Sequence, residues 1–225
     1  MKIFTEIEQL WGKKIFKDHR LEKLKERFNC PAVNYYTVEF LGTDIQKCDC
    51  LVVREQKVLD FIVEDLERAE MLSLKKPEDV LVKKILEILN SNKLLFDKLE
   101  EEELEKIKEY AFITAKPIVL YKDTTLEELL MEVFKKTNSI FFFTIVKNQA
   151  TAWLVKSNTT IVNCAAKIHT DLAKGFIRAE VFNVSNVNRF RQLEDAKIRG
   201  FLIAVDKDYI VKDGDVLDIK FNVAK

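Results

Sequence analysis

Four basic side chains gather in one short segment late in the sequence. The segment contains Arg189, Arg191, Lys197 and Arg199, with Phe190 between the first two. Basic side chains can reach phosphates and an aromatic ring can stack on a base, so this combination is typical of RNA binding. A solvated helix or loop is the alternative, because Glu194 and Asp195 lie in the same segment.

His169 is the second candidate for chemistry. It is expected near the end of a helix, where an imidazole can bond free carbonyl groups and interact with the helix dipole. The functional alternative places His169 beside Lys174 and Arg178 on an edge that binds a ligand. No Ser or Cys nucleophile and no acid–base pair accompanies His169, so we expect no catalytic residue.

The sequence lacks the glycine-rich pattern G-x-x-x-x-G-K-[S/T] that binds nucleotide phosphates. That pattern directs several backbone N–H groups at one phosphate. Gly12 is the only glycine among the first 41 residues, and its neighbours offer neither a second glycine nor a Ser or Thr for magnesium. We therefore expect no enzyme activity and no bound cofactor.

The four cysteines do not have the paired spacing of a zinc site. Cys48 and Cys50, with Cys30 and His19, could in principle hold a metal ion, but one intervening residue is not the spacing of a zinc knuckle. We expect these cysteines and Cys164 to be small buried hydrophobic residues, and we expect no metal site.

Length and charge leave several classes of function open. The 225 residues are 48% apolar, which is ample for one or two packed domains. Residues 138–225 contain 13 basic and 9 acidic side chains, a net charge of +4, which permits an anionic partner. No apolar run is long enough to span a membrane, and the first residues lack the apolar core of a signal peptide, so we expect a cytoplasmic protein.

The first 137 residues are predicted to be mixed α/β with a helical insertion. Charged helical segments with an amphipathic seam are expected over residues 56–110, with Pro77 near one helix start and the acidic run 100–105 as a solvated helix start. Outside the insertion, helices are predicted over 21–28 and 126–135, and strands over 34–41, 49–53 and 117–121.

Residues 138–225 are predicted to be mostly strand. A hairpin over 140–146 and 151–155 is followed by one helix over 160–172, which ends near Gly175 because glycine tolerates a positive φ. Strands over 176–184 and 216–223, with an Asp213-Gly214 turn before the second, complete the sheet. The run Phe141-Phe142-Phe143 is expected to lie partly in the core and partly on the sheet surface.

The stretch from Ala165 to Phe221 resembles the TGS domain, a small ubiquitin-like module. The resemblance rests on the signature Ile168-His169-Thr170-Asp171, on Asp208–Val216 and on Phe221-Asn222-Val223. These motifs are similar to the C-terminal domain of the YchF-type, Obg-like GTPase/ATPase family. A weaker similarity to the same family runs through Val38-Glu39-Phe40 and Thr114–Tyr121.

The resemblance implies an α/β (α+β) fold with two domains. Residues 1–137 would be a degenerate G-domain-like region with a helical arm at 56–110, and residues 138–225 a β-grasp TGS domain. The metal-positioning Asp of the family falls on Gly42, and Lys122-Asp123-Thr124 replaces its base-reading Asn. The family resemblance therefore implies a protein that has lost the nucleotide-binding motifs.

The implied function is non-catalytic binding to RNA or the ribosome through the basic residues named above. Two alternatives stay open. One is a regulatory protein with residual GTP or ATP binding. The other is a scaffold that binds a protein partner through the helical arm. The sequence indicates no membrane partner and leaves the oligomeric state open.

Overall fold

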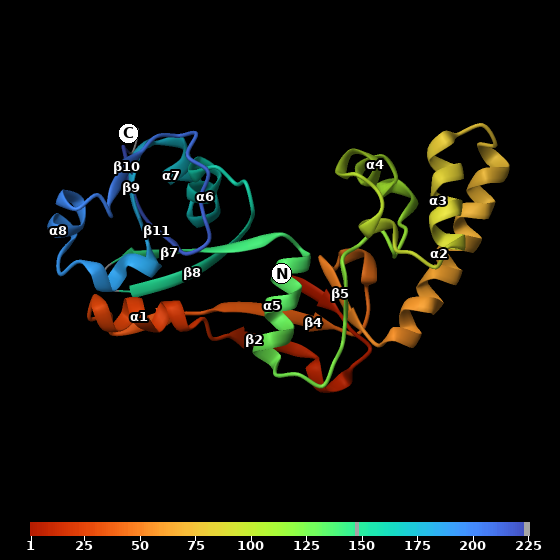
Figure 1. Cartoon of the computed structure of the whole chain (residues 1–225), viewed down its shortest axis with the longest axis horizontal. Coiled ribbons are helices and arrows are strands. Elements are labelled where there is room, and N and C mark those ends of the chain that lie inside the picture. The colour runs from red at the N-terminus through yellow and green to blue at the C-terminus, as the bar shows by residue number, and fades with distance from the viewer. Residues whose placement is uncertain (147–148, 223–225) are drawn as a thin grey trace. The chain divides into compact units, whose positions relative to one another are not determined.

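The computed structural model describes residues 1–146 and 149–222, which form two compact units (Figure 1). The first unit consists of residues 1–14 and 37–137. The second consists of residues 15–36 together with the chain from Asn138 onward. The chain passes from the first unit to the second after Thr137. The assignment of residues 15–36 to the second unit was not anticipated.

A five-stranded sheet is the centre of the first unit, with strand order β2-β4-β1-β5-β6. β1 pairs in parallel with β4 and β5, and β5 pairs in parallel with β6. All four residues of β5 are buried, because strands of a parallel sheet are covered on both faces. The strands are β1 (Lys2–Phe4), β2 (Gly12–Phe16), β4 (Tyr36–Leu41), β5 (Cys50–Val53) and β6 (Ile118–Leu120).

The remaining elements of this unit are helical. Helix α5 (Leu126–Lys136) begins with a capping box, in which Thr125 accepts from the Glu128 N–H and Glu128 accepts from the Thr125 N–H. The single-turn elements are η1 (Glu8–Leu10), η2 (Ile45–Lys47), η3 (Leu95–Asp97) and η4 (Lys108–Tyr110). Among the helices of the described residues, none has the length and apolar character needed to cross a membrane.

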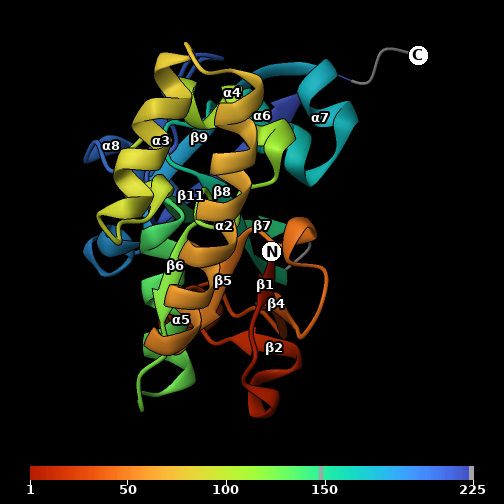
Figure 2. The same cartoon turned by 90° about the vertical axis from the view of Figure 1, so that its right-hand side faces the viewer.

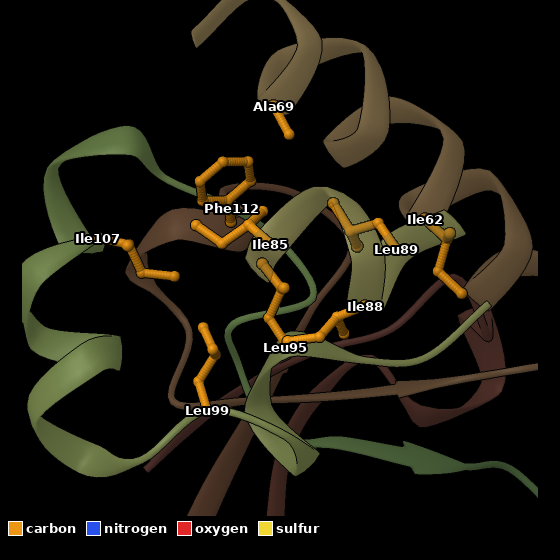
Figure 3. Close-up of a cluster of buried hydrophobic side chains, with 9 residues drawn as sticks. All are labelled: Ile62, Ala69, Ile85, Ile88, Leu89, Leu95, Leu99, Ile107 and Phe112. Carbon is orange, nitrogen blue, oxygen red and sulfur yellow. The ribbon is translucent and has the colours of Figure 1, made fainter. Parts of the chain in front are cut away.

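The predicted helical insertion is present. Helices α2 (Glu55–Lys75) and α3 (Val80–Asn90) lie side by side (Figures 1 and 2), followed by the short α4 (Glu101–Lys106). Figure 3 shows the buried apolar side chains that form the hydrophobic core of this arm and point toward one another. They are Ile62, Ala69, Ile85, Ile88, Leu89, Leu95, Leu99, Ile107 and Phe112.

Capping residues set the starts of two arm helices. Helix α3 begins at Val80, and the Asp79 side chain accepts from the N–H groups of Leu81 and Val82. The predicted start near Pro77 was therefore too early, because the N-cap residue of α3 is Asp79. The acidic run behaves as predicted. Glu100 and Glu103 form a capping box at the exposed start of α4.

A buried carboxylate fixes the arm to the rest of the first unit. Asp65 on α2 is fully buried and accepts hydrogen bonds from the N–H groups of Ile113 (2.9 Å) and Thr114 (2.7 Å). It also accepts from the Thr114 hydroxyl at 2.7 Å and from Arg68 at 2.8 Å. Burial raises the pKa of Asp65, and these hydrogen bonds oppose that rise.

A six-stranded sheet is the centre of the second unit, with strand order β10-β9-β11-β7-β8-β3. The predicted hairpin is β7 paired antiparallel with β8. The turn was expected at Lys147-Asn148-Gln149, of which residues 147 and 148 lie outside the described residues. β11 pairs antiparallel with β9 and in parallel with β7. The strands are β3 (Ala32–Asn34), β7 (Ser139–Val146), β8 (Gln149–Lys156), β9 (Phe176–Asn183), β10 (Ile203–Val205) and β11 (Asp215–Phe221).

Helices cover both faces of this sheet. On one face, α6 (Ile161–Ile168) packs its Ile161 and Cys164 against Phe142 and Val181. On the other face lies α1 (His19–Arg27), which comes from the segment 15–36. The other helical elements are α7 (Thr170–Lys174), η5 (Val184–Arg189) and α8 (Leu193–Ile198).

The phenylalanine run is entirely core, not partly surface as we expected. Phe141, Phe142 and Phe143 are each at most 3% exposed. Phe16 stacks on Phe141, with ring centroids 5.3 Å apart, and the Arg20 guanidinium lies over Phe141 and Phe143. The segment 15–36 thus covers the apolar sheet face that Phe141 and Phe143 form.

The predicted helix over 160–172 is two helices. His169 has an extended backbone (φ −162°, ψ 138°) and breaks the helix into α6 and α7. Gly175 follows α7 with φ −92°, so a positive φ is not the reason for this glycine. The reason is space, because a Cβ at Gly175 would lie 2.1 Å from the Asn222 carbonyl oxygen. Gly214, in the predicted turn, does have a positive φ of 87°.

Replacing Asp65 tests its role as the anchor of the arm. Asp65→Ala leaves buried N–H groups and Arg68 without their acceptor, so we expect a loss of about 3 kcal/mol of unfolding free energy, measured by urea denaturation. Glu64→Ala is the matched control. Glu64 is exposed and bonds Arg68 at 3.0 Å, so its loss should cost about 0.5 kcal/mol or less. Equal effects of the two substitutions would contradict the anchor.

Candidate RNA-binding surface of the second unit

The predicted basic residues come from η5, from α8 and from the turns beside them. Asn183 caps η5 by accepting from the Ser185 N–H, and η5 ends at Arg189. Lys197 lies in the last turn of α8, and Arg199 is its C-terminal cap residue. The four basic side chains are all exposed, namely Arg189, Arg191, Lys197 and Arg199.

Two of these arginines meet on one aromatic ring. The guanidinium of Arg199 lies 5.3 Å from the centroid of Phe201, and that of Arg189 lies 5.8 Å from the same centroid. Arg199 also donates a hydrogen bond to the Arg189 carbonyl oxygen. Phe201 is half-buried, so the two cations are held at the surface by a ring that the core supports.

Phe190 does not provide the aromatic surface that we predicted. It is 3% exposed and packs edge-on against Phe182, with ring centroids 5.4 Å apart. The Arg27 guanidinium lies over its ring and donates to its carbonyl oxygen. Phe190 is therefore a core residue, and Phe201 is the aromatic residue that lies beside the exposed arginines. Phe201 could not be singled out from the sequence, because it follows the basic segment and meets the two arginines only in the folded chain.

The acidic side chains near this surface neutralise it only in part. Lys197 lies 3.8 Å from Glu180, and Arg199 lies 3.8 Å from Asp195. Exposed pairs at this distance contribute little and exchange readily with other ions. Arg191 donates only its backbone N–H to Asp195. Within the described residues, its side chain forms no ion pair, so it is available to an anion.

Arg178 lies on the face of the second sheet that also carries Glu180, the partner of Lys197. It lies on β9, where it is exposed and stands opposite Lys220 of β11. Two residues further along β9, Glu180 points to the same face and reaches Lys197. A hydrogen bond from Lys220 to Asp218 raises the pKa of the Lys220 ammonium group.

His169 and Lys174 are exposed but are not joined to the arginines. The Asp171 N–H donates to Nδ1 of His169 at 3.2 Å, so His169 caps the start of α7. The prediction that His169 bonds the carbonyl groups at a helix end was wrong. Lys174 lies in the last turn of α7. In the part of the chain that the structure describes, no hydrogen bond or ion pair connects either residue with Arg178.

The carboxyl ends of β1 and β4 in the first unit are where an α/β sheet of this type would bind a nucleotide. There, Nε1 of Trp11 donates to the Thr5 carbonyl oxygen at 3.0 Å, and the indole packs so closely on Gly42 that a Cβ would lie 2.4 Å from it. Glu6 accepts from the Arg54 N–H at 2.8 Å. The Trp11 indole and the Glu6 carboxylate thus occupy the space after β1 where a nucleotide phosphate would bind.

The cysteines are buried, as we predicted. Burial raises the pKa of Cys164 to about 12, with the nearby Asp215 as a second cause, so its thiol stays protonated at neutral pH. Among the residues that the structure describes, no group of three His, Cys, Asp or Glu side chains could hold a metal ion.

Comparison with known proteins relates the chain to the YchF family. Residues 140–222 match the family model YchF-GTPase_C, described as a protein of unknown function (DUF933). The ribosome-binding ATPase YchF of Mycoplasma genitalium is 27% identical over 209 residues, which cover 66% of this chain and 57% of that protein. The protein of the same name from Escherichia coli O157:H7 is 38% identical over 98 residues, which cover 44% of this chain and 27% of that protein.

A solved structure extends the likeness to most of the fold. The YchF GTPase of Schizosaccharomyces pombe superposes with a TM-score of 0.76 over 92% of this chain and 86% of that chain, at 15% identity. The chain therefore has a mixed α/β fold similar to that of a YchF GTPase. It spans little more than half the length of the first curated relative and about a quarter of the second.

The different roles of the two phenylalanines can be measured. Phe190→Ala removes a ring from the core, so we expect it to lower the unfolding free energy by about 3–5 kcal/mol in urea denaturation. Phe201→Ala removes a half-buried ring, so it should cost about 1.5 kcal/mol or less. The reverse order of effects would place Phe190, not Phe201, at the surface.

Proposed function

We propose that this chain is a non-catalytic, translation-associated relative of YchF that binds RNA of the ribosome through its second unit. In this proposal the second unit is a TGS domain of the β-grasp type. The observation that carries the proposal is the pair of exposed guanidinium groups, those of Arg189 and Arg199, held on the ring of Phe201.

This arrangement suits the RNA backbone. Guanidinium groups bind phosphates with two parallel hydrogen bonds, and Arg189 and Arg199 are oriented before any ligand arrives. Residues 138–225 carry the net charge of +4 that would attract a polyanion. Relatives named ribosome-binding ATPases support the same assignment. Lys174, Arg178 and His169 would extend the contact along the neighbouring edge.

Two observations support the absence of nucleotide hydrolysis. The sequence carries no glycine-rich phosphate loop after β1. The Glu6 carboxylate and the Trp11 ring lie at the strand ends where such a loop would be, and a carboxylate repels phosphate. Residual GTP or ATP binding would instead appear as a rise in the melting temperature with millimolar nucleotide and magnesium. We expect no such rise.

A protein contact of the helical arm stays a prediction. Four apolar side chains on α2 are more than half exposed and would form it, namely Leu59, Val63, Met71 and Leu74. A captured partner that is lost when Leu59 and Val63 are replaced by Ser would support this role. Retention of that partner would count against it.

Removing three arginines tests the RNA contact. Arg189→Gln, Arg191→Gln and Arg199→Gln together should weaken binding of a labelled single-stranded ribosomal RNA fragment, measured by fluorescence anisotropy. The slope of log affinity against log salt should fall by about 2, because each phosphate contact on a single strand contributes roughly 0.7.

A variant of the first unit with the same loss of charge is the control. Lys75, Lys83 and Lys108 are exposed there, and their replacement by Gln should leave both affinity and salt slope unchanged. Equal losses in the two variants would show that only total charge matters. Unchanged affinity of the arginine variant would exclude this surface.

A further inference from the structure

An apolar cavity opens on the same side of the second sheet as Glu180. Its volume is about 110 Å³. Strands β7, β9 and β11 contribute to it, together with the residue after α1 and the residues around α8. The lining residues are Phe28, Ile145, Glu180, Phe182, Leu193, Leu202, Val216, Leu217 and Asp218.

The size of the cavity limits what it can hold. An apolar protein cavity of about 150 Å³ accommodates one benzene molecule. At 110 Å³ this cavity is smaller, but it is open to solvent, so one six-membered ring can enter it edge-first and leave its outer edge at the mouth. A fused two-ring system has still less room. Drug-sized ligands need several times this volume.

Two carboxylates stand together at the mouth of the cavity. Glu180 of β9 and Asp218 of β11 are directly opposite in the antiparallel register, so their side chains lie on one face of the sheet. Glu180 has a side chain that is 22% exposed, and that of Asp218 is 58% exposed. Ionised carboxylates only accept hydrogen bonds, so a ligand at the mouth must carry hydrogen-bond donors.

A lysine ammonium group lies beside each of these carboxylates. The Lys197 ammonium lies 3.8 Å from Glu180, and the Lys220 ammonium lies 2.6 Å from Asp218. Arg178, opposite Lys220, adds a further positive charge on the same face. The mouth therefore has a net positive charge, which does not favour a free cation. It favours a neutral ring with donor groups attached to an anionic backbone.

We propose that this cavity binds an unstacked cytosine base of single-stranded RNA, a proposal that rests on the RNA-binding function proposed above. The ring enters the apolar cavity, and its exocyclic amino group donates to Glu180 or Asp218. Arg178 and Lys197 contact the flanking phosphates. Single-stranded RNA is commonly recognised by bases that leave the stack and are read on their Watson–Crick edges.

The choice of base follows from the acceptors and from the volume. Carboxylates accept from the N4 amino group of cytosine. Uracil presents a carbonyl oxygen at that position, which a carboxylate repels. Adenine and guanine carry an amino group but have two fused rings, which exceed the cavity. Cytosine alone satisfies both conditions.

Labelled ten-residue homopolymers of cytidylate, uridylate and adenylate test the proposal by fluorescence anisotropy with the full chain. We expect the cytidylate oligomer to bind about tenfold more tightly than the other two, the discrimination of one well-placed base contact. Glu180→Gln with Asp218→Asn adds amide donors, so the preference over uridylate should fall to about twofold or less. Affinity for uridylate should rise, because the amide groups can donate to its carbonyl oxygen and the two carboxylates that repel it are gone.

Two further variants separate the cavity from general effects. Leu193→Trp, at a 39% exposed position of the lining, fills the cavity and should abolish the cytidylate preference without lowering the melting temperature. Glu194→Gln with Asp206→Asn removes two exposed carboxylates that do not line the cavity, and it should leave the preference intact.

Each outcome has a defined meaning. Equal binding of the three oligomers by the wild-type chain, with normal salt dependence, would overturn the cytosine pocket and leave the RNA-binding function standing. A preference that survives in both the carboxamide variant and Leu193→Trp would also overturn it. Failure to bind any oligomer at low salt would overturn both proposals together.

Discussion

The structure of the second unit depends on the docking of α1 against its sheet. Phe141 and Phe143 form an apolar face that residues 138–222 leave uncovered, and Phe16 and Arg20 cover it. Arg20 also bridges Asp18 at 2.7 Å and Asp213 at 2.5 Å, while Asp213 accepts from the Phe141 N–H. One cation thus joins the helix to the turn that precedes β11.

This docking has consequences for the proposed binding surface. Phe28, just after α1, packs against Phe182 and contributes to the cavity. Arg27, in the last turn of α1, holds Phe190 in the core and leaves Phe201 as the surface aromatic. The surface that we propose for RNA is therefore built by residues from both ends of the sequence. A fragment that starts at residue 138 would lack part of it.

Local patterns predicted the elements whose neighbours are close in sequence. Strand β5, the α2–α3 pair, α5 and the β7–β8 hairpin all lie where the periodicity placed them. The long-range partners were not predictable, because periodicity shows that a side chain is buried but not what buries it. Three features depend on such long-range partners: residues 15–36 belong to the second unit, Phe190 is buried, and Gly175 lies close to Asn222.

The candidate site was predictable in part. The sequence identified the basic residues, because charge is visible without a fold. It could not identify Phe201, Glu180 or Asp218 as their neighbours, because strand register and the turn after α8 bring these residues together. The break at His169 was hidden for a similar reason. The run Cys164–Leu172 has helical spacing throughout, yet His169 adopts an extended backbone.

The central claim is a ribosome contact that is made by charge and needs no nucleotide. Co-sedimentation of the full chain with ribosomes over a salt series, without nucleotide and with ATP or GTP and magnesium, tests it most directly. We predict binding that weakens steeply with salt and is the same in all three conditions. Binding that requires a nucleotide, or that does not respond to salt, would contradict it.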